Sequence, residues 1–137
     1  MNRKKILIVD DNEVILRTIS LKLKASGYDV FTAQDGSEAV STVRTRKPDL
    51  VLLDLGFPPE VSGVAWDGFL IIQWLRRIEE AKNTPIIVIT VSEAAKYKER
   101  AMAEGAIAFF QKPINNEELL ATIHQVLNDA PVAKAGQ

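Results

Sequence analysis

Several acidic side chains stand where apolar segments of this chain end. Asp10 and Asp11 close the run KILIVDD, and Asp54 closes PDLVLLD. Two other polar residues follow similar runs, Thr90 after PIIVI and Lys112 after AIAFFQ. Carboxylates that gather in one place repel each other, and a hard divalent cation such as Mg²⁺ relieves that repulsion. With a lysine and a hydroxyl beside them, they could support attack by Asp54 on a phosphorus atom.

This chemistry requires several strand ends to meet, and the sequence predicts such an arrangement. We predict strands over residues 5–11, 28–33, 48–54, 84–90 and 106–113, and helices over 13–27, 35–46, 68–81, 92–105 and 115–129. Strands that are apolar on both faces are typical of a parallel sheet covered by helices on each side. The predicted fold class is therefore α/β, a doubly wound five-stranded parallel sheet with five helices. Such sheets bind ligands at the carboxyl ends of their strands.

The composition limits the classes of protein to which the chain can belong. Its 137 residues are 47% hydrophobic and 26% charged with a net charge of −1, which is typical of one globular domain. We predict one domain over residues 1–129 and a flexible tail or linker stub over 130–137. The lack of cysteine excludes disulfides and thiolate metal sites. The sequence has no basic tract that would indicate direct nucleic-acid binding. Its apolar runs are too short to span a membrane. We predict a cytoplasmic protein.

Four short motifs at the predicted strand ends resemble those of the receiver domain of two-component response regulators. They are VDD at 9–11, LLDL at 52–55, VIT at 88–90 and KP at 112–113, and the resemblance extends over residues 5–128. Each motif is weak alone, but the set in this order is specific. The resemblance implies a flavodoxin-like sheet with strand order 2-1-3-4-5, as in chemotaxis regulators. It also implies a Lys112–Pro113 peptide bond that is often cis.

The resemblance further implies roles for the acidic residues. Asp54 would accept a phosphoryl group from a histidine kinase or a histidine phosphotransfer protein. Mg²⁺ would be bound by Asp11, Asp54 and the backbone carbonyl of Gly56, with Asp10 acting mainly through water. Mn²⁺ could take the place of Mg²⁺. The domain would be a self-phosphorylating and self-dephosphorylating switch rather than a turnover enzyme.

The remaining residues that the resemblance assigns would sense the phosphoryl group. Thr90 and Lys112 would contact its oxygens, and Phe109 would change rotamer together with Thr90. The switch would alter binding to a downstream protein target or a fused output domain. The protein would be a monomer or a weak dimer that depends on phosphorylation.

The sequence departs from the family pattern directly after Asp54. The Asp-Gly pair at 67–68 comes late, so residues 59–66 contain an insertion. Its apolar residues could shape kinase docking or cover the phosphoryl group, or the segment could be a neutral surface loop. Val91 follows Thr90 where relatives usually have Ala or Gly, and it could narrow the path of an attacking water.

Two other functions are open on the sequence alone. An aspartate-dependent phosphohydrolase would have a second acid two residues after its nucleophile, but Asn12 and Gly56 occupy that spacing after Asp10 and Asp54. A degenerate receiver could act as a phosphorylation-independent binding module, although all five key polar residues are present. The acidic pair could also belong to a helix cap, with Asp11 or Asn12 as the capping residue.

Overall fold

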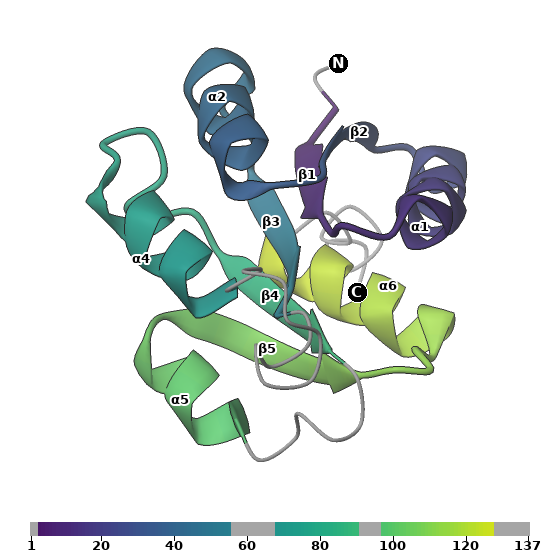
Figure 1. Ribbon diagram of the computed structural model, residues 1–137. Helices are drawn as coiled ribbons and strands as arrows, with labels where there is room; N and C mark the ends of the chain where they lie inside the picture. The colour runs from purple at the N-terminus through teal and green to yellow at the C-terminus, as the bar shows by residue number, and fades with distance from the viewer. Residues whose placement is uncertain (1–2, 56–67, 91–96, 128–137) are drawn as a thin grey trace, which may run out of the picture.

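The computed structural model describes residues 3–55, 68–90 and 97–127 of the chain. Its centre is a five-stranded parallel sheet in the order β2-β1-β3-β4-β5 (Figure 1). The strands are β1 (Lys5–Val9), β2 (Asp29–Ala33), β3 (Leu50–Asp54), β4 (Ile86–Thr90) and β5 (Ala106–Gln111). This arrangement confirms the predicted fold class and strand order.

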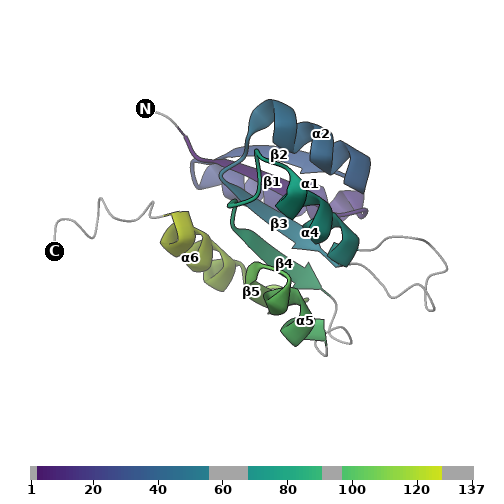
Figure 2. The same ribbon diagram turned by 90° about the vertical axis from the view of Figure 1, so that its left-hand side faces the viewer.

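Five helices in the described ranges cover the sheet on both faces. They are α1 (Glu13–Ala25), α2 (Gly36–Arg46), α4 (Gly68–Arg77), α5 (Lys98–Ala103) and α6 (Asn116–Leu127). Helices α1 and α6 lie on one face, and α2, α4 and α5 lie on the other (Figures 1 and 2). Because all strands run in parallel, their carboxyl ends meet at one edge, and Asp10, Asp54, Thr90 and Lys112 lie there.

The strand sequences explain why helices must cover both faces. Successive side chains of a strand point to opposite faces, and β1 is apolar at both sets of positions. Ile6 and Ile8 pack with α1 and α6, whereas Leu7 and Val9 pack with α2, α4 and α5, all at 1% exposure or less. Strands β3 and β4 are buried along their whole length. Burial on both faces fixes the register, because a slip by one residue would exchange the two sets.

Capping residues set where the first two helices begin. Asn12 accepts hydrogen bonds from the backbone N–H groups of Val14 and Ile15 at 2.9 and 3.2 Å. Asp35 accepts one from the backbone N–H of Glu38 at 2.8 Å. These contacts satisfy amide donors that the first turn of a helix leaves without partners. Each of these helices therefore starts close behind a strand end.

Some predicted helix ends are late: α1 and α5 end two residues before the predicted residues 27 and 105, and α4 ends four residues before residue 81. Helix α4 ends at Arg77. Ile78 and Ala81 stay buried beyond this end, which is why the apolar pattern extended the predicted helix to residue 81. The Arg76 guanidinium donates to the carbonyl oxygens of Ala81 and Thr84 at 3.0 and 2.8 Å and holds this connection to β4. The helix predicted over 92–105 is described in part, as α5.

Some predictions concern residues outside the described ranges. They include Gly56 as a metal ligand, the insertion at 59–66, Val91 and the tail at 130–137. These stay predictions. None of the described helices is long and apolar enough to cross a membrane.

Candidate functional site

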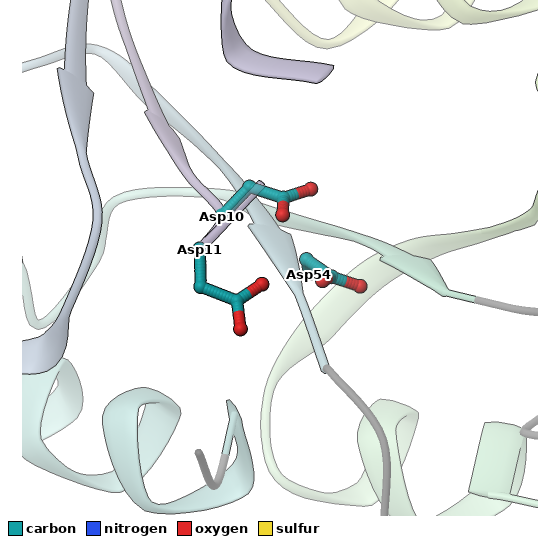
Figure 3. A group of neighbouring side chains, drawn as sticks. All are labelled: Asp10, Asp11 and Asp54. Atoms are coloured by element: carbon teal, nitrogen blue, oxygen red, sulfur yellow. The ribbon is translucent and has the colours of Figure 1, made fainter. Parts of the chain in front are cut away.

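The predicted acidic residues meet at the carboxyl edge of the sheet. Carboxylate oxygens of Asp10, Asp11 and Asp54 all lie within 4.8 Å of one another (Figure 3). Asp10 and Asp54 are buried, at 2% and 6% exposure, while Asp11 is exposed. The acidic cluster therefore has a buried base and a side that faces solvent.

Neighbouring strands bring these carboxylates together. Strands β1 and β3 pair with Val9 opposite Leu53. Asp10 and Asp54 directly follow these two paired residues and therefore lie side by side. The backbone N–H of Asn12 donates to Asp10 Oδ1 at 2.8 Å and holds that carboxylate at the strand end. Because Asn12, and not Asp11, caps α1, the Asp11 side chain is left for the acidic cluster.

Lys112 is the cation beside the acidic cluster. Its Nζ lies 3.5 Å from Asp10 Oδ2 and 3.6 Å from Asp54 Oδ1. Its backbone N–H donates to the Thr90 carbonyl oxygen at 2.7 Å, which joins the end of β5 to the end of β4. The Lys112–Pro113 peptide bond is cis. Among the described residues, one ammonium group lies beside a cluster of three carboxylates, so an excess of negative charge remains there.

The surroundings of Asp10 disfavour its charged form. Burial raises the pKa of Asp10 above its ordinary value, and the Asn12 N–H and Lys112 offset the rise only in part. A hard divalent cation would neutralise the remaining charge. Carboxylate oxygens are ligands that Mg²⁺ prefers, and the exposed side at Asp11 allows an ion to keep some of its waters. The described residues thus fit Mg²⁺, with Asp10, Asp11 and Asp54 as candidates to hold it.

Thr90 places a buried hydroxyl next to the strand that carries Asp54. It ends β4 and follows Ile89, which pairs with Asp54 of β3. Its side chain is fully buried, and Oγ1 has no hydrogen-bond partner among the residues that the structure describes. Buried polar side-chain atoms nearly always have a partner. This hydroxyl is therefore available to an anionic oxygen that binds at Asp54.

Phe109 lies on β5, three residues before Lys112. It pairs with Val88 of β4, is half-buried, and packs against the part of the core that α2, α4 and α5 cover. A rotamer change of its ring would therefore alter the packing on the face of the sheet that α5 covers. The switch role that the resemblance implied for Phe109 stays a prediction.

Gly68 is a positioning residue that the sequence analysis did not recognise. A Cβ atom here would lie 2.6 Å from the Cα of Leu55 and 3.0 Å from the carbonyl oxygen of Asp54. Only glycine therefore lets α4 begin directly against the end of β3. The Asp-Gly pair at 67–68 was the available signal, but it indicated a loop length and not a close approach of two backbones.

Comparison with known proteins gives the family. Residues 6–124 match the model of the response regulator receiver domain. The chain belongs to this family. It is thus a receiver domain of the two-component response regulator type, in agreement with the motifs at the strand ends.

Similar proteins extend over nearly the whole receiver domain. The polar-differentiation response regulator DivK of Brucella anthropi is 33% identical over 127 residues, which are 93% of this chain and 98% of DivK. The chemotaxis response regulator CheY4 of Vibrio cholerae superposes with a TM-score of 0.78 at 32% identity, over 91% of this chain and 99% of CheY4. The non-phosphorylated HemR receiver domain of Leptospira biflexa gives a TM-score of 0.76 at 30% identity, over 91% and 94%.

Proposed function

We propose that Asp54 accepts a phosphoryl group from the phosphohistidine of a histidine kinase or a histidine phosphotransfer protein. The observation that supports this most is the buried Asp54 carboxylate beside Lys112, Asp10 and Asp11 at the carboxyl edge of the sheet. Response regulator receiver domains work with kinases and output partners. This reaction needs a nucleophile, a cation and metal-ligand oxygens at one place, and Asp54, Lys112 and the acidic cluster would supply them.

The transfer exchanges one bond to phosphorus for another. A carboxylate oxygen of Asp54 attacks in line, the O–P bond forms as the N–P bond breaks, and the imidazole leaves with the electron pair. Lys112, whose Nζ is 3.6 Å from Asp54 Oδ1, would pair with an oxygen of the transferred group. Mg²⁺ held by Asp10, Asp11 and Asp54 would supply further neutralisation of the phosphoryl charge.

Phosphorylation would change the surroundings of Thr90. An acyl phosphate on Asp54 offers the Thr90 hydroxyl an acceptor, which it lacks among the described residues. This hydrogen bond would draw the end of β4 toward Asp54, and Phe109 on the paired strand would change rotamer with it. The domain would then shift between two states that differ in affinity for a downstream protein target or a fused output domain.

The same residues favour a switch over a turnover enzyme. The position two residues after Asp10, where a phosphohydrolase would have an acid, is Asn12, whose side chain caps α1. Attack of water on the acyl phosphate would return the Asp54 carboxylate and inorganic phosphate, which resets the switch. With a kinase as partner, the domain would act in the cytoplasm, as a monomer or as a weak dimer after phosphorylation.

Intact-mass measurement with a small phosphodonor tests the proposal. With Mg²⁺ and acetyl phosphate or phosphoramidate, wild-type protein should gain one phosphoryl group, and Asp54→Ala should gain none. Asp29→Ala is the matched control, because Asp29 lies in the same sheet but at the amino end of β2. The control should be modified as wild type is, and chelation of Mg²⁺ should prevent modification of both.

Two results would contradict the proposal. An unmodified wild-type protein under every condition would indicate a degenerate receiver that binds partners without phosphorylation. Sustained release of phosphate from phosphate esters, lost in Asp54→Ala, would indicate a phosphohydrolase.

A further inference from the structure

A groove between α2 and α4 has no role in the proposed phosphoryl chemistry. The two helices pack side by side on one face of the sheet (Figures 1 and 2), and the groove between them has a volume of about 490 Å³. Its lining consists of Ser37, Val40, Ser41, Arg44 and Thr45 of α2 and Trp74 of α4. The α2 residues recur at helical spacing, so they form one stripe about 12 Å long at a rise of 1.5 Å per residue.

Trp74 is the apolar anchor of this groove. Its side chain is 38% exposed, although the neighbouring Leu75 is fully buried. Gly36 of α2 fixes one edge of the indole, because a Cβ atom there would collide with Cζ3 of Trp74. An exposed aromatic ring that is held in place loses little freedom when a partner packs on it, and such rings often dominate binding energy.

The charge of the groove selects its partner. Arg44 is the one charged side chain in the lining, and it forms no ion pair with any described residue. Arg77, exposed one turn after Trp74, adds a second positive charge on α4. The other polar lining groups are hydroxyls, and one of them, Thr45 Oγ1, already donates to the Ser41 carbonyl oxygen at 2.9 Å. The complementary surface is therefore apolar with negative charge beside it.

We propose that the α2–α4 groove binds an acidic amphipathic helix of a partner protein. An apolar side chain of that helix packs on the Trp74 indole, and a carboxylate pairs with Arg44 near the C-terminal end of α2. The length of the α2 stripe matches about two turns of a bound helix, and helices commonly dock by laying an apolar face into such grooves. The interaction needs neither Asp54 nor its phosphorylation.

Selection from a random peptide library tests both the place and the chemistry. The full chain is immobilised, and phage that display random 16-residue peptides are selected on it and depleted on Trp74→Ala. The enriched peptides should carry Leu, Ile or Phe at helical spacing and a net negative charge. Their affinity, measured by fluorescence anisotropy, should fall at least tenfold on Arg44→Glu. Arg17→Glu, which reverses an exposed arginine on α1, is the matched control and should bind as wild type does.

Two further measurements guard against misreading the Trp74→Ala result. Gly36→Ala forces the indole out of its position while keeping every lining residue, and it should weaken binding of the same peptides. Peptides remade with Lys in place of Glu should bind Arg44→Glu better than they bind wild type. Both results should be the same in an Asp54→Ala background, so they do not depend on the proposed phosphoryl transfer.

Other outcomes would overturn the proposal. Enriched peptides without negative charge, equal binding to Arg44→Glu, or no peptide that distinguishes wild type from Trp74→Ala would each exclude an acidic helix as the occupant. Concentration-dependent self-association in sedimentation, lost in Trp74→Ala, would assign the groove to a second copy of the chain instead.

Discussion

Charged groups at the two edges of the sheet have very different partners. At the amino edge, the Arg76 guanidinium donates to the carbonyl oxygens of Ala81, Thr84 and Gly105 at 2.8–3.0 Å. At the carboxyl edge, Lys112 lies 3.5 and 3.6 Å from two carboxylates of a cluster of three. At the amino edge, the Arg76 guanidinium thus serves to hold the fold together. The carboxyl edge keeps charge and a buried hydroxyl for a ligand.

The turn before β5 is built around the Arg76 guanidinium. Gly105 adopts a φ of +119°, which side-chain-bearing residues rarely adopt, and a Cβ there would lie 2.7 Å from Arg76 Nε. One side chain of α4 thus ties together the connection to β4 and the connection to β5. At the carboxyl edge the corresponding side chain, Lys112, contacts charged carboxylates and not backbone carbonyl oxygens. The two edges should therefore respond to substitution in opposite ways.

The largest effect is expected for Arg76→Met. The substitution removes the hydrogen bonds to four backbone carbonyls, those of Ala81, Lys82, Thr84 and Gly105. It should lower the free energy of unfolding by about 2–4 kcal/mol, measured by urea denaturation. Arg77→Met is the control, because Arg77 is the exposed neighbour, and it should change stability by less than about 0.5 kcal/mol. Equal losses for both variants would show that the Arg76 contacts do not stabilise the amino edge.

Asp10→Asn should have the opposite effect at the carboxyl edge. It removes a buried charge that faces two other carboxylates, and without metal it should raise the free energy of unfolding by about 1 kcal/mol. The same variant should bind Mg²⁺ at least about tenfold more weakly. Urea denaturation in EDTA and in saturating Mg²⁺ measures both quantities.

The control for this variant is Asp29→Asn, which leaves the acidic cluster intact. It should keep the stabilisation by Mg²⁺ that wild type shows. If Asp10→Asn instead lost stability in EDTA, the attraction between Lys112 and the Asp10 carboxylate would outweigh the repulsion. The contrast between the two edges would then fail.

The sequence predicted the carboxyl edge better than the amino edge, for a physical reason. In parallel strands, residues that directly follow apolar runs come to one edge, so Asp10, Asp54, Thr90 and Lys112 could be assigned to one place from their positions alone. Spacing could not choose between Asp11 and Asn12 as the cap of α1, because both residue types accept from helix amides. The structure decides for Asn12.

Contacts between segments that are far apart in the chain have no pattern in the sequence comparable to the polar residues at strand ends. The apolar spacing of α4 continues through Ile78, so it could not show that the helix ends at Arg77. The contacts of Arg76 with the carbonyl oxygen of Gly105, and of Gly36 with Trp74, join segments about 30 or more residues apart. Such pairs follow from the packing of whole elements and have no local signal in the sequence.

A smaller effect is expected for Thr90→Val at the carboxyl edge. Valine keeps the shape of threonine and removes a buried hydroxyl that has no hydrogen-bond partner among the described residues. The free energy of unfolding should stay unchanged or rise by up to about 1 kcal/mol. Phosphoryl uptake measured by intact mass should persist, whereas any stabilisation that phosphorylation gives to wild type should shrink. Thr32→Val, at an exposed position of β2, is the control, and it should leave that stabilisation unchanged.

Tyr28→Phe removes one hydroxyl at the other edge, and it sharpens the comparison with Thr90→Val. The Tyr28 hydroxyl forms a 2.7 Å hydrogen bond with His124 Nδ1, which links the amino end of β2 to the last turns of α6. Its loss should lower the free energy of unfolding by about 0.5–1.5 kcal/mol in urea denaturation. Phosphoryl uptake should not change, because Tyr28 lies at the amino end of β2 and Asp54 at the carboxyl end of β3. Of these two deletions of a single hydroxyl, only Tyr28→Phe should therefore lower the free energy of unfolding. If both variants lost the same stability, the Thr90 hydroxyl would have a partner in the resting protein and would not be held ready for a phosphoryl oxygen.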